Sequence, residues 1–190
     1  LTENKQITLT QVKVDPDLIF DDVTKTFGDP NFNLTATSSS TGVFTFTISD
    51  TTIATVAGST VSIVAAGITV ATVSQTSDSK YLAATATMTL TINKADPTIV
   101  FNDVTKNFGD VDFDLVASSN SSGTFSFIVS DTSVATVISS TITIIGGGST
   151  IITLNQSEVN NYNAGVATMT LTINKASISI TFDDLTKTYG

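Results

Sequence analysis

The sequence predicts an all-β protein made of tandem antiparallel β-sandwiches in an extended array. Three observations lead to this fold class. A stretch of 81 residues is repeated, apolar and polar residues alternate along short segments, and turn residues separate these segments at near-regular intervals. In addition, no long segment shows the 3.6-residue apolar period of an amphipathic helix.

The repeat is visible in one phrase that occurs three times. FDDVTKTFGDP begins at Phe20, FNDVTKNFGDV begins at Phe101 and FDDLTKTYG begins at Phe182, so each copy starts 81 residues after the previous one. We therefore predict the terminal strand of a preceding repeat in residues 1–14 and sandwich repeats in residues 15–95 and 96–176. Residues 177–190 are predicted to be the first strand of a following repeat.

The opening phrase of each repeat is expected to form the first edge strand and the turn after it. Phe20, Val23 and Phe27 should anchor this strand in the core. Gly28 would permit a positive φ angle, and Pro30 would sit where the sheet needs no backbone donor.

The remaining strands follow from strict alternation. In the last strand of the first repeat, Met88, Leu90 and Ile92 should face the core, while the intervening threonines face solvent. The same period predicts strands at residues 32–36, 44–48, 60–64 and 86–92. Turn residues lie between them at 28–30, 39–42, 57–59, 66–67 and 77–80.

Composition excludes several functional classes. The chain has no cysteine and no histidine, so it cannot build cysteine–histidine zinc sites, Ser-His-Asp triads or a cysteine nucleophile. A net charge of −9 argues against nucleic-acid binding, and no apolar run is long enough for membrane insertion. Few lysines, no arginine and many threonines favour an extracellular or cell-surface location over the cytoplasm.

Four segments resemble a known family. SDTTIATVAGSTVSIVAAG at 49–67 and SDTSVATVISSTITIIGGG at 130–148 resemble the central motif of bacterial immunoglobulin-like domains of group 2. DVTKTFGD at 22–29 and YNAGVATMTLTINKA at 162–176 resemble MBG-type repeats of large bacterial surface proteins. The resemblance implies immunoglobulin-like sandwiches in extracellular tandem arrays and no catalytic residues. The first repeat departs from it at Leu82 and Ala84, where the second has Asn163 and Gly165.

The clearest candidate binding site is acidic. Asp110, Asp112 and Asp114 are spaced by two, which places them on one side of an extended segment, and carboxylate oxygens suit calcium. A solvated strand face is the alternative explanation for this spacing. A second version of a calcium site would use the carboxylates near the start of the first repeat, which are Asp15, Asp17, Asp21 and Asp22.

Two further possibilities remain open in the sequence. Lys25 or Lys106 could form an isopeptide bond with Asn93 or Asn174, which would require a buried neutral lysine beside an acid. The row of threonines from Thr85 to Thr91 resembles Thr-x-Thr rows that bind ice, although exposed strand faces favour threonine in any case.

These observations predict a structural function. The chain is expected to be a stalk or spacer segment of a long, adhesin-like surface protein that displays a distal binding region, and not an enzyme. The alternative is a binding module whose loops or edges contact a glycan, a host protein or a neighbouring subunit. Expected partners are neighbouring repeats of the same chain and other copies through the terminal strands, which could form filaments; apart from the possible calcium, no cofactor is expected.

Overall fold

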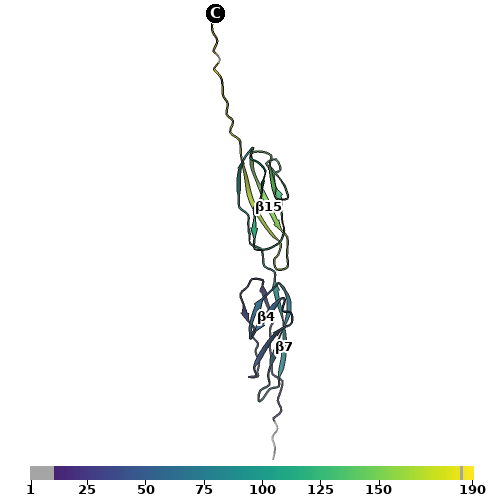
Figure 1. Ribbon diagram of the computed structural model, residues 1–190. Coiled ribbons are helices and arrows are strands. Elements are labelled where there is room, and N and C mark those ends of the chain that lie inside the picture. Colours follow the sequence, from purple (N-terminus) through teal and green to yellow (C-terminus); the bar gives the residue numbers. More distant parts are fainter. Residues whose placement is uncertain (1–10, 185) are drawn as a thin grey trace, which may run out of the picture. The chain divides into compact units, whose positions relative to one another are not determined.

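The computed structural model describes residues 11–184 and 186–190, and all of its regular elements are β-strands. The chain forms two compact units (Figure 1). Unit 1 consists of Leu1–Asp96 with Asn160–Asn163, and unit 2 consists of Pro97–Val159 with Ala164–Gly190. In the described part, no helix is long and apolar enough to cross a membrane.

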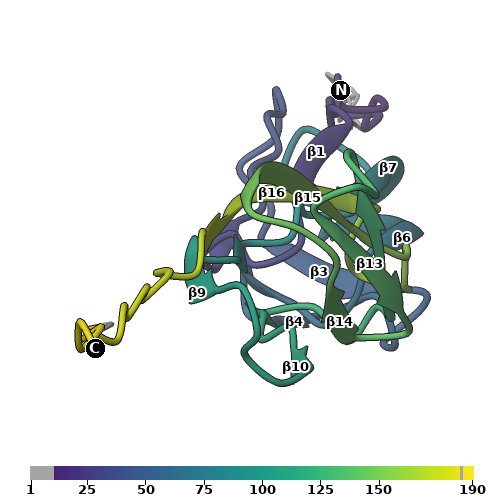
Figure 2. The same cartoon turned by 90° about the horizontal axis from the view of Figure 1, so that it is seen from above.

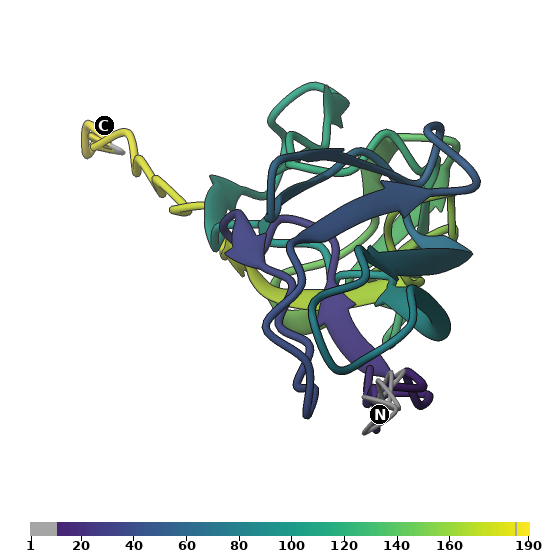
Figure 3. The ribbon, with the colours of Figure 1, turned by 90° about the horizontal axis from the view of Figure 1, so that it is seen from below.

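In its described residues, unit 1 contains two sheets, and its strands are coloured purple to teal in Figure 3. A four-stranded sheet has the order β1-β7-β6-β3, and a three-stranded sheet has the order β2-β5-β4. The strands are β1 Val23–Thr26, β2 Phe32–Asn33, β3 Phe44–Ile48, β4 Ala54–Ala57, β5 Thr60–Ile63, β6 Gly67–Gln75 and β7 Ala84–Asn93.

Unit 2 repeats this arrangement, with β9-β16-β15-β12 as the larger sheet and β10-β14-β13 as the smaller one. Figure 2 shows β15 beside β16 and β13 beside β14. A short pair, β8 with β11, corresponds to the isolated bridge between Ile19 and Thr37 in unit 1. The strands are β8 Ile99–Val100, β9 Val104–Asn107, β10 Phe113–Asp114, β11 Ser118–Ser119, β12 Phe125–Val129, β13 Ala135–Ile138, β14 Thr141–Ile144, β15 Gly148–Gln156 and β16 Gly165–Asn174.

Each unit is a β-sandwich because side chains of its two sheets share one core. In unit 1, Val61 from the smaller sheet and Val73 and Leu90 from the larger sheet are all fully buried. The alternation along the last strand is confirmed, since Met88 and Ile92 are also buried. The all-β sandwich fold predicted from the sequence is therefore confirmed.

One pairing in each unit departs from the antiparallel arrangement expected from the sequence. β1 pairs with β7 in parallel, with Val23 opposite Leu90 and Thr26 opposite Asn93. β9 pairs with β16 in the same way. The first strand lies beside the last strand and not in a hairpin with the second, which belongs to the smaller sheet. All other pairings between named strands in the described part are antiparallel.

The opening phrase behaves largely as predicted. Phe20 is buried, and Val23 and Phe27 are half-buried against the same core. Gly28 has a φ angle of 92° and its counterpart Gly109 has 100°, a backbone conformation that side chains with a Cβ atom rarely adopt.

The two terminal segments differ. Residues 1–10 lie outside the described part, and Val14 forms a parallel bridge with Tyr81. The described residues of 177–190 belong to no strand, and Ile178, Ile180 and Phe182 are all exposed. The pairing of terminal strands with other copies of the chain stays a prediction.

Candidate functional site

The acidic cluster predicted in the second repeat is divided among separate partners. Asp110 accepts a hydrogen bond from the backbone N–H of Asn107 at 2.9 Å, which closes its own turn. Asp112 accepts from the Thr143 hydroxyl at 2.9 Å, and Asp114 accepts from the Thr141 hydroxyl at 2.6 Å. Among residues 11–184 and 186–190, no three acidic side chains are grouped in a way that could hold a metal ion. A calcium site therefore stays a prediction from the sequence.

Thermal unfolding of unit 2 with calcium and with a chelator tests this site. Calcium held by the cluster would raise the melting temperature, and Asp112→Ala would abolish that response. The first repeat has the weaker set Asp29, Asn31 and Asn33, so unit 1 serves as the internal control. An unchanged melting curve in chelator would contradict calcium binding.

The residues considered for an isopeptide bond have other roles. The Lys25 ammonium lies over the Phe32 ring, 5.1 Å from its centroid, and Lys106 lies over Phe113 at 5.0 Å. These cation–π contacts hold each lysine against the smaller sheet. Asp22, an acid three residues before Lys25, accepts a hydrogen bond from the Thr89 backbone N–H.

The feature that both units share most closely is a terminal-strand pair, which we define as β1 with β7 in unit 1 and β9 with β16 in unit 2. At one end of the first pair, the Asp22 carboxylate accepts from the Thr89 N–H at 2.6 Å. At the other end, the Phe27 N–H donates to the Asn93 carbonyl at 2.8 Å. The parallel ladder between them is thus extended by a hydrogen bond at each end.

Unit 2 reproduces this geometry. Asp103 accepts from the Thr170 N–H at 2.7 Å, and the Phe108 N–H donates to the Asn174 carbonyl at 2.9 Å. In addition, the Asn174 side chain donates to Asn107 across the pair. The repeated phrase at Phe20 and Phe101 therefore encodes the strand that fastens the start of each unit to its end.

A buried glutamine lies at the end of a strand of the larger sheet in each unit, Gln75 at the end of β6 and Gln156 at the end of β15. Gln75 is 2% exposed, and its side-chain amide donates to the carbonyls of Ser40 and Gly42 at 3.0 and 3.1 Å. Its carbonyl oxygen accepts from the Ser38 hydroxyl at 2.6 Å. Gly42 is required beside it, because a Cβ atom there would overlap the Thr76 carbonyl.

These glutamines were not predicted from the sequence, although the signal is present. Ala71, Val73 and Gln75 share the inward parity of β6, so a polar residue interrupts an otherwise apolar face. Gln156 occupies the same position in the second repeat. A buried polar side chain needs hydrogen-bond partners, so this pattern predicts a local network.

Asp78 organises the loop before β7 in unit 1. Its carboxylate accepts backbone hydrogen bonds from Thr41, Lys80 and Tyr81 and a hydroxyl hydrogen bond from Ser40. These donors, led by the Thr41 N–H, hold the pKa of Asp78 well below its usual value. The second repeat has Val159 at this position, so its loop lacks this anchor.

We expect unit 1 to lose stability relative to unit 2 when the pH falls from about 5 to about 2. The folded-state pKa of Asp78 is depressed, so its contribution is present above the unfolded-state value of about 3.9 and disappears as the carboxylate becomes protonated. Asp50 and Asp131 also have lowered pKa values, but they occupy matching positions in the two units. The measurement is the difference in amide exchange between the units as a function of pH. Asp78→Asn should remove most of that pH-dependent difference, and an unaltered pH profile would contradict this role.

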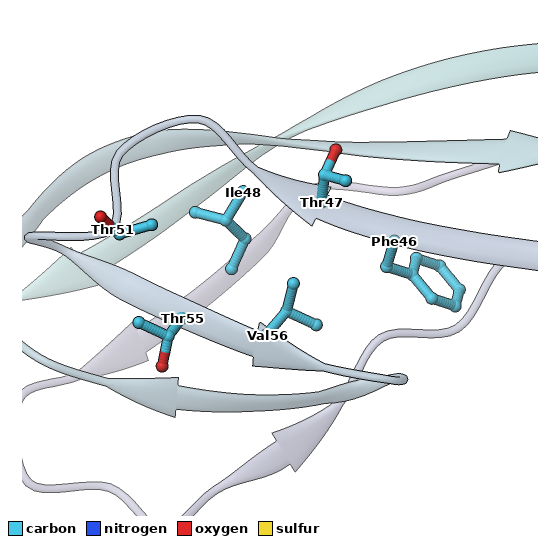
Figure 4. A pocket seen from close by; sticks show the side chains of 6 residues that line it. All are labelled: Phe46, Thr47, Ile48, Thr51, Thr55 and Val56. Atoms are coloured by element: carbon cyan, nitrogen blue, oxygen red, sulfur yellow. The ribbon is translucent and has the colours of Figure 1, made fainter.

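Unit 1 has a hollow of about 410 Å³ beside β3 and β4 (Figure 4). Phe46, Thr47 and Ile48 line it from β3, and Thr55 and Val56 line it from β4, with Thr51 between the strands. The lining offers apolar surface and hydroxyl groups. It has no carboxylate, amine or imidazole, so it cannot supply a general acid or base.

No protein-family model matches the chain, and no curated protein matches it. The chain is similar in structure to the EC1-2 fragment of human protocadherin-24, with a TM-score of 0.36 and 12% identity over 87% of this chain and 100% of that chain. It is also similar to domains 4–9 of surface layer protein SbsC, with a TM-score of 0.35 and 17% identity over 76% of this chain and 26% of that chain. Fibronectin(III)-like modules of Clostridium thermocellum CbhA match with a TM-score of 0.31 and 12% identity over 88% of this chain and 100% of that chain. Membership of the bacterial group 2 family stays a prediction.

Proposed function

We propose that this chain is a load-bearing stalk segment of a long extracellular or cell-surface repeat protein. The observation that carries the proposal is the terminal-strand pair of each unit. Tension applied through the chain enters a unit at the start of its first strand and leaves at the end of its last strand. Because the two strands are parallel neighbours, tension pulls them in opposite directions along their length.

This geometry resists force well, since sliding one strand past the other must break the ladder hydrogen bonds together and not one at a time. In unit 1, the ladder from Val23 to Thr26 is joined by the hydrogen bonds of Asp22 and Phe27 at its two ends. Unit 2 has the same bonds at Asp103 and Phe108. A stalk that holds a distal binding region under shear needs this property in every repeat.

The composition supports the location. Neither unit contains a disulfide, a histidine or a cysteine, so its stability depends on packing and hydrogen bonds that do not change with redox conditions. The outer face of the larger sheet in unit 1 carries exposed Thr85, Thr87 and Thr89, which keep that face soluble without a strong local charge. The protein we propose is therefore a passive spacer, and its partners are the repeats before and after it.

Single-molecule force spectroscopy on the 190-residue chain, pulled from its two ends, tests the proposal. We expect two unfolding events of similar force. Lys25→Pro should lower the force of one event only. Alternate residues of a strand direct their N–H groups to the same side, so Lys25, like Phe27, directs its N–H to β7, and proline has no such donor.

The control separates mechanical from thermodynamic stability. Val61 is fully buried in β5, outside the force path, so Val61→Ala should lower the melting temperature of unit 1 while changing its unfolding force much less. Equal losses of force in Lys25→Pro and Val61→Ala would contradict the load-bearing role of the terminal-strand pair.

The hollow between β3 and β4 favours a second candidate, a binding module. Its apolar lining residues, such as Phe46 and Val56, and its threonine hydroxyls are suited to the apolar faces and hydroxyl groups of a sugar. Screening the chain on a glycan array tests this function directly. Saturable binding that Phe46→Ala abolishes would favour the module over the spacer.

A further inference from the structure

One short segment contacts three positions in unit 1, which are Phe27, Ala66 and Ala95. We call residues 160–163, Asn-Asn-Tyr-Asn, the Tyr loop; it belongs to unit 1. The Tyr162 ring packs edge-on against Phe27 with 5.6 Å between centroids. The Asn161 side-chain oxygen accepts from the Ala66 N–H at 3.0 Å.

The third position is Ala95, whose backbone N–H and carbonyl are both hydrogen-bonded to the main chain of the Tyr loop. We call this pair of hydrogen bonds a bracket. The Ala95 N–H donates to the Asn161 carbonyl at 3.0 Å, and the Asn163 N–H donates to the Ala95 carbonyl at 2.9 Å. The same bracket occurs once more in unit 1, where Val14 takes the place of Ala95 and Tyr81 the place of Tyr162. There the Val14 N–H donates to the Lys80 carbonyl at 3.1 Å, and the Leu82 N–H donates to the Val14 carbonyl at 2.9 Å.

The counterparts of these positions in unit 2, 81 residues further on, are Phe108, Gly147 and Ala176. All three are open. Phe108 is 47% exposed, whereas Phe27 is half-buried. In the described part of the chain, the N–H groups of Gly147 and Ala176 have no hydrogen-bond partner, although their counterparts Ala66 and Ala95 do.

The three open positions belong to one surface. Phe108 is bonded to the carbonyl of Asn174, two residues before Ala176. A Cβ atom on Gly147 would lie 2.9 Å from the Cγ atom of Lys175. We call Phe108, Gly147 and Ala176 the end surface of unit 2. It combines an exposed aromatic ring with two unpaired backbone donors, which is the set of groups that the Tyr loop engages in unit 1.

We propose that the end surface of unit 2 is the docking site for the Tyr loop of a following repeat. The tyrosine edge would cover Phe108, an asparagine side chain at the position before it would accept from Gly147, and the loop backbone would bracket Ala176. The occupant is argued from the chain itself, because FDDLTKTYG after Ala176 restarts the repeat whose later part carries this loop. The inference goes beyond the proposed function, since it holds whether the array bears load or binds a ligand.

The test extends the intact chain by a third repeat. Gly190 corresponds to Gly109, so appending a copy of residues 110–176 after Gly190 completes the repeat and adds a Tyr loop with its asparagine. Amide hydrogen exchange is then compared by NMR between the 190-residue and extended chains. We expect the Ala176 and Gly147 amides to exchange at least about tenfold more slowly in the extended chain.

A second extension uses a copy of residues 29–95 instead, which supplies the loop of the first repeat with lysine where the Tyr loop has Asn161. Ala176 should again be protected, as Val14 is bracketed by this loop in unit 1, but Gly147 should stay fast because a lysine side chain cannot accept. In the 190-residue chain, Asn161→Ala should make Ala66 exchange as fast as Gly147. The proposal is overturned if neither extension slows the amide exchange of Ala176, or if the Ala66 amide stays protected in Asn161→Ala.

Discussion

Leu171→Ala is expected to lower the free energy of unfolding of unit 2 by about 2–5 kcal/mol, the range for truncating a fully buried leucine. Leu171 is 0% exposed and lies in β16, between β15 and β9. The space that the substitution leaves is therefore closed to solvent. The effect should exceed that of Phe127→Ala, since Phe127 is only half-buried although its alternation points it to the core. Amide exchange of β15 and β16 in chemical denaturant measures the loss.

Leu90→Ala is the matched control, because Leu90 occupies the same position in unit 1 and is also 0% exposed. Its loss should appear in β6 and β7 and leave the exchange of β15 and β16 nearly unchanged, as expected of repeats with separate cores. If either substitution accelerated exchange in both units equally, the two cores would not be independent.

Gln75→Leu is expected to destabilise unit 1 by about 2–5 kcal/mol even though it adds apolar surface to the interior. Leucine has a similar volume but cannot donate, so the carbonyls of Ser40 and Gly42 would lose their partner, at about 1–3 kcal/mol for each buried group. The Ser38 hydroxyl would lose its acceptor as well. Thermal and denaturant unfolding of the variant measure the change.

Two controls accompany this variant. Gln156→Leu should have a similar effect on unit 2, where Gln156 donates to Ser121 and Gly123 at 2.9 and 3.1 Å. Gln11→Leu, at an exposed position, should change the stability of either unit very little. A neutral or stabilising Gln75→Leu would show that water replaces the lost donor and that the network is not needed for the fold.

Much of the fold follows from local patterns. The strand Phe44–Ile48 matches its predicted range, and the last strand of each repeat extends its predicted range by a few residues. Both were identified because one face of each strand is exposed to solvent and the other is buried, so polar and apolar side chains alternate with a period of two. Gly28 was identified because a turn with positive φ leaves glycine as the favoured residue.

Other elements were not identified in the sequence. The strand β6, Gly67–Gln75, shows weaker alternation because Ile68 and Val70 are apolar on its outer face, where both are exposed. The hydrogen-bond partners of Asp110, Asp112 and Asp114 were also not identified, because spacing alone cannot show which donors approach each carboxylate; calcium binding by this cluster stays a prediction. In the fold, threonines of β14 approach two of them, and these threonines lie about 30 residues away in the sequence.

By itself, the sequence determined the all-β class, the 81-residue period, the buried face of the strands and the absence of cysteine and histidine chemistry. These are properties of composition and of local side-chain alternation, so they need no knowledge of distant contacts. The tertiary structure decided which strand lies beside which. The parallel pairing of β1 with β7, the partners of Gln75 and the open state of Phe108 all depend on residues tens of positions apart. Such pairings are set by how two sheets close over one core, and no local pattern of side chains records that closure.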